Sequence, residues 1–281
     1  FYTGCEKEGT LDRDTAKDLW EKFKDFAKYA FNKSHAASYA LVTFQTAYLK
    51  YYYPVEYMAA LMTSLLDSTD KVSGYIAACK DMGIPVLPPD INRSEDHFTV
   101  EGDAVRFGLG AVKNVGRGLI RTMAAHRAEG GPFKSLEDFI ERMGERELNK
   151  RAVENFIKCG AADCFGYHRS ELLAVFESMM DSIASTRKKN LEGQMGLFGM
   201  LEEDSSTAIP IPKMAEASKA ELMLMEKETT GMYISGHPMD DYRPYLRNTH
   251  VVHMGKLMDE ESHFEDDQIV SVAGIVQSVK M

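Results

Sequence analysis

The chain has 281 residues, 44% of them hydrophobic and 27% charged, which are ordinary values for a folded protein and leave room for two or three domains. Its net charge of −10 argues against a protein that binds nucleic acid over its whole surface. The most apolar window, residues 41–66, is interrupted by charged residues and a proline, so no membrane contact is expected. The four scattered cysteines predict neither a metal site nor an oxidising compartment, and a cytoplasmic protein is expected.

Helices are predicted over the first eighty residues. Apolar residues recur at helical spacing along residues 11–31, and Ser34 can cap a second helix that ends before Pro54. Pro54 stands at the favoured first position of a third helix, and a fourth is expected from Thr69 to Met82. The aromatic side chains of the second helix either stack on nucleic-acid bases or pack in a core, and their spacing favours the core. These side chains are Phe44, Tyr48 and Tyr51.

A change of pattern follows. Alternation around Gly102-Asp103 predicts a short β-hairpin near residues 97–108, after which helices resume. The next glycine pair, Gly108 and Gly110, resembles a dinucleotide-binding loop, but Lys113 stands where the third glycine is required, and that interpretation is rejected. A mobile loop is predicted at about residues 186–218, a helix at 216–230, and a first strand of a further β-domain near 268–280.

Positive charge is concentrated in the middle of the chain. Residues 106–169 hold 12 basic and 8 acidic side chains, whereas residues 1–105 hold 11 and 16, and residues 192–281 hold 7 and 16. If the chain binds nucleic acid, the middle block is therefore the expected contact surface.

A helix-hairpin-helix pattern begins this block. We expect a helix, a tight turn at Asn114-Val115-Gly116, and a second helix from Arg117. Asparagine tolerates the left-handed conformation of such a turn, glycine lets a phosphate approach, and the free N–H groups of the second helix attract an anion. Such a site grips the phosphate backbone and not the bases. Its candidate residues are Lys113, Asn114, Val115, Gly116, Arg117, Gly118 and Arg121.

A second candidate hairpin lies at residues 148–176. A single hairpin is weak support, because any turn between two helices has this pattern, but two of them inside the basic block favour binding of duplex DNA. The candidate residues of this hairpin are Lys150, Arg151, Gly160, Gly166 and Arg169.

The stretch "QMGLF", residues 194–198, places two large apolar side chains in a polar, charged segment with little local structure to bury them. Either they bind a hydrophobic pocket on a partner protein, or they fold back as a lid on the helix at 216–230.

Several stretches resemble one family, the bacterial C-family replicative DNA polymerases, which are the DNA polymerase III α subunits. The resemblance rests on "FNKSHAASYALVTFQTAYLK", "YPVEYMAALM", "MGIPVLPPDINRS", "FGLGAVKNVG", "LNKRAVENFIKCGAADCFG", "QMGLF" and "EKETTGMYISGHPMDDY", which follow one another in the family's order along nearly the whole chain.

The resemblance implies a mainly α fold in three parts. Residues 1–80 resemble the end of the fingers domain, and residues 81–245 the tandem helix-hairpin-helix domain that binds duplex DNA and the sliding clamp. Residues 246–281 resemble a linker and the start of an OB domain. Because the chain begins at Phe1 and ends in an incomplete β pattern, we expect a fragment of a longer protein.

The resemblance also implies a function. The full-length protein is expected to be a DNA-directed DNA polymerase that uses Mg²⁺ held by palm carboxylates, whereas the fragment holds no catalytic or metal-binding residue and is expected to be inactive alone. Expected partners are primer-template duplex, the β sliding clamp and other DNA polymerase III holoenzyme subunits. Two alternatives are a free-standing DNA-repair adaptor and an error-prone paralogue.

Individual residues acquire roles from the same resemblance. Lys33 and His35 either contact nucleotide or template phosphate, or simply pack at the start of a helix. The clamp-binding motif is formed by Gln194, Met195, Gly196, Leu197 and Phe198.

Overall fold

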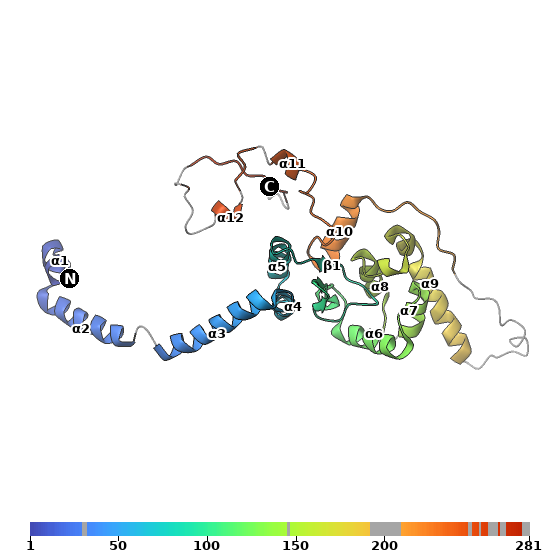
Figure 1. Ribbon diagram of the computed structural model, residues 1–281, viewed down its shortest axis with the longest axis horizontal. Helices are drawn as coiled ribbons and strands as arrows, with labels where there is room; N and C mark the ends of the chain where they lie inside the picture. Colours follow the sequence, from blue (N-terminus) through green and yellow to red (C-terminus); the bar gives the residue numbers. More distant parts are fainter. Residues whose placement is uncertain are drawn as a thin grey trace, which may run out of the picture. The chain divides into compact units, whose positions relative to one another are not determined.

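The computed structural model describes residues 1–29, 33–144, 147–191, 209–246, 249–252, 254–257, 264 and 268–276 (Figure 1). The chain forms two compact units, Phe1–Tyr57 and Met58–Met281. The division falls inside helix α4, which spans Pro54–Ser64. The three-part division implied by the resemblance stays a prediction.

The first unit contains α1 (Tyr2–Glu8), α2 (Arg13–Tyr29) and α3 (Lys33–Tyr52). The ring of Phe1 stacks on that of Trp20, with centroids 5.4 Å apart, and so joins α1 to α2. Because α3 begins at Lys33, Ser34 lies within its first turn, and the prediction that Ser34 precedes the helix as its cap is wrong.

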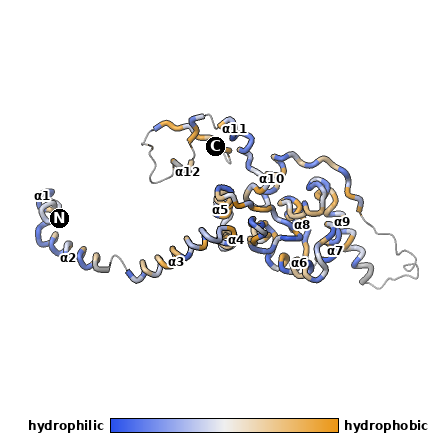
Figure 2. Tube along the Cα trace, viewed as in Figure 1, coloured by the Kyte–Doolittle hydropathy of each residue, from blue (hydrophilic) through white to orange (hydrophobic). Residues whose placement is uncertain are grey.

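The core predicted along α3 is also wrong. Apolar and polar residues are interspersed along this helix (Figure 2), and Phe44 and Tyr51 are 69% and 78% exposed. A helical stripe becomes a core only where another element covers it. Here the rings of α3 contact one another instead, as in the pair Tyr48 and Tyr52, whose centroids lie 4.4 Å apart.

The second unit opens with α4 and with α5 (Thr69–Asp81), which ends before Gly83 in the left-handed region at φ 74°. The predicted hairpin is confirmed: β2 (Thr99–Glu101) pairs antiparallel with β3 (Ala104–Arg106) through a turn at Gly102. A strand that the pattern did not predict, β1 (Val86–Leu87), pairs parallel with β3, so the sheet order is β1-β3-β2.

Helices follow the sheet. They are α6 (Arg117–Gly130), α7 (Leu136–Met143), α8 (Lys150–Lys158) and α9 (Arg169–Leu191), with short 3₁₀ turns η1 (Leu109–Ala111) and η2 (Asp163–Phe165). The aromatic rings of Phe107, Phe139 and Phe156 are fully buried and lie in the core of this unit. Side-chain oxygens cap two of these helices, because Ser135 accepts from the N–H of Asp138 and Asn149 accepts from that of Ala152.

The predicted mobile loop at 186–218 is wrong at both of its ends. Helix α9 continues to Leu191, and residues 209–218 run as an extended segment that is hydrogen-bonded to the start of α9. The predicted next helix is confirmed as α10 (Lys219–Thr230), which begins with a reciprocal capping box between Ser218 and Glu221.

The last part contains α11 (Arg243–Leu246) and α12 (Met254–Leu257). In the described residues 268–276, which are part of the strand predicted at 268–280, Ser271 forms an isolated β-bridge with Val251. None of the described helices has the length and apolar character needed to cross a membrane.

Candidate nucleic-acid interface

The first hairpin has the predicted turn. Asn114 is at φ 61°, the one residue other than glycine with positive φ in the described part of the chain, and Gly116 precedes α6, which begins at Arg117. The element before the turn differs from the prediction: it is the single 3₁₀ turn η1 and not an α-helix, because Val112 returns to an extended conformation.

The N-terminus of α6 is open. No side chain caps it, and the N–H groups of Arg117, Gly118 and Leu119 have no acceptor among the described residues. The side chains of Arg117 and Arg121 are exposed, and neither forms an ion pair with any residue that the structure describes. A helix N-terminus that carries free N–H groups and adjacent arginines is suited to an anion.

The charge of these arginines affects the pKa of a neighbouring carboxyl group. The pKa of Asp96 lies below its ordinary value, first because His97 hydrogen-bonds its carboxylate, and further because Arg121 and Arg117 lie close to it. The surface beside the turn is also uncrowded: a Cβ added at Gly116 or at Gly118 would meet no atom within 4 Å. A phosphate can therefore approach the backbone at these two positions.

The turn of the first hairpin is fixed by contacts with the rest of the protein. The side chain of Val115 is 8% exposed and anchors the turn in the core. The ammonium of Lys113 has a partner within the protein, because its Nζ donates to the carbonyl of Glu228 at 2.9 Å.

The glycine pair just before this turn serves packing. A Cβ at Gly108 would collide with the backbone of His97 and Phe98, and one at Gly110 would collide with the carbonyl oxygen of Asp96. These glycines let η1 lie against the segment that leads into β2, which agrees with the rejection of a dinucleotide-binding loop.

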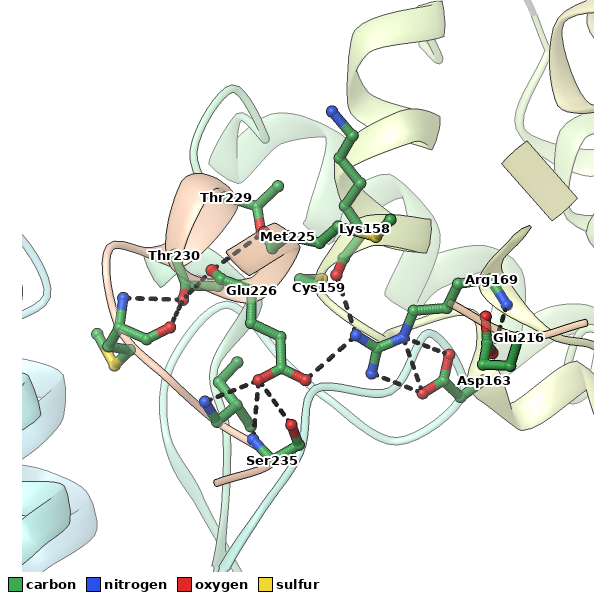
Figure 3. A network of polar contacts seen from close by, with 12 residues as sticks. Lys158, Cys159, Asp163, Arg169, Glu216, Met225, Glu226, Thr229, Thr230 and Ser235 are labelled. Carbon is green, nitrogen blue, oxygen red and sulfur yellow. Dashed lines mark hydrogen bonds and ion pairs between the residues drawn. The ribbon is translucent and has the colours of Figure 1, made fainter. Parts of the chain in front are cut away.

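The second hairpin differs from the first because its arginine at the start of α9 is buried in ion pairs. Arg169 was expected at the DNA surface, but its side chain is only 8% exposed. Figure 3 shows its guanidinium between Asp163 and Glu226, at 2.9 Å and 3.1 Å, with the carbonyl of Lys158 as a further acceptor. Most N–H donors of this buried guanidinium are therefore occupied by protein acceptors, which argues against a phosphate contact by Arg169.

The anion site of the second hairpin is filled by the protein. The carboxylate of Glu216 accepts from the backbone N–H of Arg169 at 2.9 Å and of Ser170 at 3.3 Å, at the N-terminus of α9. Gly160, also expected at the DNA surface, is buried at φ 86°, with the guanidinium of Arg169 where a Cβ would be. Glycine is needed there for internal packing, and this buried position argues against a DNA contact by Gly160.

The remaining candidates of this hairpin are exposed. Nζ of Lys150 lies 2.8 Å from a carboxylate oxygen of Asp181 and 3.6 Å from one of Glu177, so its charge is largely balanced. Arg151 and Gly166 are exposed, and Arg151 has no ion-pair partner in the described residues. The second hairpin therefore offers less free positive charge than the first.

Other arginines of the basic block are structural as well. Arg106 is 7% exposed and holds Glu101 at 2.8 Å across the hairpin, and Arg127 is 10% exposed and binds Glu95 at 2.7 Å. Arg142 lies over the ring of Phe133, 4.2 Å from its centroid. The positive charge counted in the sequence is thus partly buried, and Arg117 and Arg121 are among the side chains of the block that stay exposed.

Three residues that organise this region were missed by sequence reasoning: Glu216, Glu226, and Asn155, whose Nδ2 donates to the backbone carbonyl of Lys113. Each acts on a partner distant in the chain, and the sequence contains no signal for that pairing. In the first unit, Lys33 and His35 are exposed at the start of α3, and the ring of His35 lies 4.4 Å from that of Tyr39. The predicted clamp motif, residues 194–198, lies outside the described residues.

Comparisons with known proteins agree with this geometry. A family model for the helix-hairpin-helix motif matches residues 83–172, which include the turn at Asn114 and all of α6 to α8. The chain is 42% identical to the DNA polymerase III subunit alpha of Thermus aquaticus over 99% of its length, 41% to that of Chlamydia pneumoniae over 88%, and 38% to that of Vibrio cholerae over 100%.

The chain spans only part of these relatives, between 20% and 24% of their length. Two of these similarities cover 99% and 100% of the chain. Proteins named DNA polymerase III subunit alpha therefore cover nearly the whole chain, which is similar to one segment of them.

Proposed function

We propose that this chain is the part of a replicative DNA polymerase that holds the primer-template duplex by its phosphate backbone, chiefly through the first hairpin. The observation that carries the proposal is the open N-terminus of α6, with the exposed Arg117 and Arg121 beside it, inside the segment that matches the helix-hairpin-helix family. The names of the relatives support a role in DNA synthesis.

The proposed contact has three components. The N–H groups of the first turn of α6 donate to phosphate oxygens, Arg117 and Arg121 add charge, and Gly116 and Gly118 let the phosphate come close. Asn114 supplies the left-handed residue that the turn requires. Since none of these groups reads a base edge, binding is expected to be independent of sequence and strongly dependent on salt. Arg151, with Lys150 beside it, is proposed as a weaker contact from the second hairpin.

The clamp motif adds a second attachment. Leu197 and Phe198 are proposed to enter a hydrophobic pocket of the β sliding clamp, with Gln194 orienting the segment and Met195 and Gly196 as the variable positions between them. Burial of two large apolar side chains is worth roughly 3–6 kcal/mol gross, part of which is offset by ordering the segment. Attachment to both duplex and clamp raises the overall avidity.

The polymerase chemistry is proposed for the whole protein. Among the described residues, no three histidine, cysteine, aspartate or glutamate side chains come together as a metal site, so the carboxylates that hold Mg²⁺ are not assigned here. Primer extension by the 281-residue chain is expected to equal a control without protein. Extension above that control would contradict the proposed division of roles. Contacts with other holoenzyme subunits and a cytoplasmic location belong to the same proposal.

Duplex binding is tested by fluorescence anisotropy with two duplexes of unrelated sequence. We expect equal affinities, and the double variant Arg117→Glu/Arg121→Glu should weaken both by at least about tenfold, since it reverses two charges at the contact. The matched control is Lys71→Glu/Lys80→Glu on α5, which makes the same change of charge at two exposed positions. Equal losses in both double variants would show a non-specific charge effect and would reject the first hairpin as the site.

A further inference from the structure

Lys113 is bonded to two distant helices at once. Its backbone N–H donates to the carbonyl of Thr229 at 2.8 Å, and its Nζ donates to the carbonyl of Glu228 at 2.9 Å. Its own carbonyl accepts from Nδ2 of Asn155 at 2.5 Å. Glu228 and Thr229 lie in the last turn of α10, and Asn155 belongs to α8, so the residue just before the left-handed Asn114 is fixed on both sides.

These bonds are also favourable for α10. The last four carbonyls of a helix have no N–H donor within the helix, and a lysine beside them satisfies one carbonyl and opposes the negative end of the helix dipole. The two N–H···O bonds from Lys113 therefore complete the C-terminus of α10 while they hold the turn. Arg117 and Arg121 have no such internal partner in the described residues.

Helix α10 contacts the second hairpin as well. The buried Glu226 binds Arg169, and Glu228 lies 3.4 Å from Nζ of Lys158, which also pairs with Glu154 at 2.8 Å. One helix thus joins the two hairpins, and the first hairpin depends on it for the position of its turn.

We propose that Lys113 and Asn155 are positioning residues for the DNA-binding turn, which they hold against α10 and α8, and that Lys113 is not a ligand of phosphate. This inference rests on the proposed binding of duplex DNA. Replacing Lys113 should lower the affinity for duplex DNA because it disturbs the geometry of Asn114 and Gly116. Replacing Arg117 should lower that affinity because a phosphate contact is missing.

Salt dependence separates the two roles. Each phosphate contact contributes about −0.9 to the slope of log K against log salt concentration on duplex DNA. Lys113→Met and Asn155→Ala should each weaken duplex binding by about tenfold or less, the effect of one hydrogen bond, with the slope of the wild-type protein unchanged. Arg117→Met should lower the magnitude of the slope by about 0.9. Because Lys113 and Asn155 act on the same turn, the double variant should lose less affinity than the sum of the two single losses.

The backbone amides of the free protein give an independent readout. In ¹⁵N spectra, Lys113→Met and Asn155→Ala should shift the same peaks, those of Asn114 to Gly116, while Arg117→Met leaves Asn114 and Val115 in place. A slope reduced by Lys113→Met as much as by Arg117→Met, together with unshifted turn amides, would overturn the inference. If the wild-type chain fails to bind duplex at all, the proposed function fails, and the amide shifts still decide whether these two residues hold the turn.

Discussion

Glu226 and Arg169 form an ion pair of 3.1 Å in which the two side chains are 1% and 8% exposed. The second carboxylate oxygen of Glu226 accepts from the backbone N–H groups of Ile234 and Ser235, at 2.9 and 2.8 Å. The pair therefore joins α9 and α10 to the segment that follows α10, and it replaces a DNA contact that the sequence pattern alone would assign to Arg169.

The first prediction concerns this pair. Arg169→Met should lower the free energy of unfolding by roughly 3–5 kcal/mol, because it leaves the charge of Glu226 buried with fewer partners. Adding Glu226→Gln to that variant should cost less than Glu226→Gln costs in the wild-type protein. Urea denaturation followed by circular dichroism measures all four proteins, and additive losses would mean that the two side chains are not energetically coupled.

The second prediction concerns His168, whose imidazole Nδ1 lies 2.9 Å from the carbonyl of Met214. This hydrogen bond raises the pKa of His168 above its ordinary value of 6.5, with help from Glu171 and Glu216 and against the effect of desolvation. A raised pKa means that the folded state favours the protonated form. The stabilising contribution is therefore fully present below about pH 6.5 and is lost as the pH rises through the raised pKa.

His168→Ala should accordingly lower the stability more at about pH 5.5 than at about pH 8.5, and an NMR titration of the wild-type imidazole should give a pKa above the ordinary value. An equal effect of the variant at both pH values would show that protonation of His168 does not stabilise the docked segment at 209–218.

The third prediction uses two glycines that have empty space around them. Gly118 lies in the first turn of α6 and Gly74 in the middle of α5, and an added Cβ would meet no atom within 4 Å at either position. Replacement by alanine should raise stability by roughly 0.5–1 kcal/mol at both, since alanine is the better helix former.

Only Gly118→Ala should weaken binding of duplex DNA, because only its Cβ stands where a phosphate is proposed to approach. Thermal melts and anisotropy titrations on the same samples compare the two variants. Unchanged DNA affinity in Gly118→Ala would show that no close approach of phosphate occurs at this position.

The fourth prediction concerns the clamp motif. Replacing Leu197 and Phe198 with alanine should abolish most of the calorimetric signal of binding to a bacterial sliding clamp and leave the melting temperature nearly unchanged. The competing lid hypothesis makes the opposite prediction, since truncation of packed apolar side chains lowers the melting temperature by several degrees. Retained clamp binding with a lowered melting temperature would support the lid.

The local features of the first hairpin could be predicted from the sequence. A turn that needs left-handed φ favours asparagine, and the pattern placed that residue at Asn114, the position where the structure has it. The helix start at Arg117 and the hairpin at Gly102 follow from similarly short-range chemistry.

The long-range pairings could not be predicted. Whether an arginine is exposed or forms a buried ion pair depends on which carboxylate the fold brings to it. Arg169 pairs with Glu226, which lies on a helix far along the chain. The acid that occupies the N-terminus of α9, Glu216, lies in a segment whose polar composition indicated a mobile loop. The prediction that the aromatic side chains of α3 pack in a core was wrong for a related reason. Helical spacing predicts which residues share a face, but it does not predict which element covers that face.

The most direct test of the central claim maps duplex DNA onto the backbone amides. In an NMR titration of the 281-residue chain with a short duplex, the largest shifts are predicted at residues 114–121, where the N–H groups of α6 are open. Small shifts are predicted at Arg169 and Ser170, whose N–H groups are bound by Glu216. Shifts centred on the start of α9, with none at 114–121, would contradict the assignment of the first hairpin as the duplex-binding site.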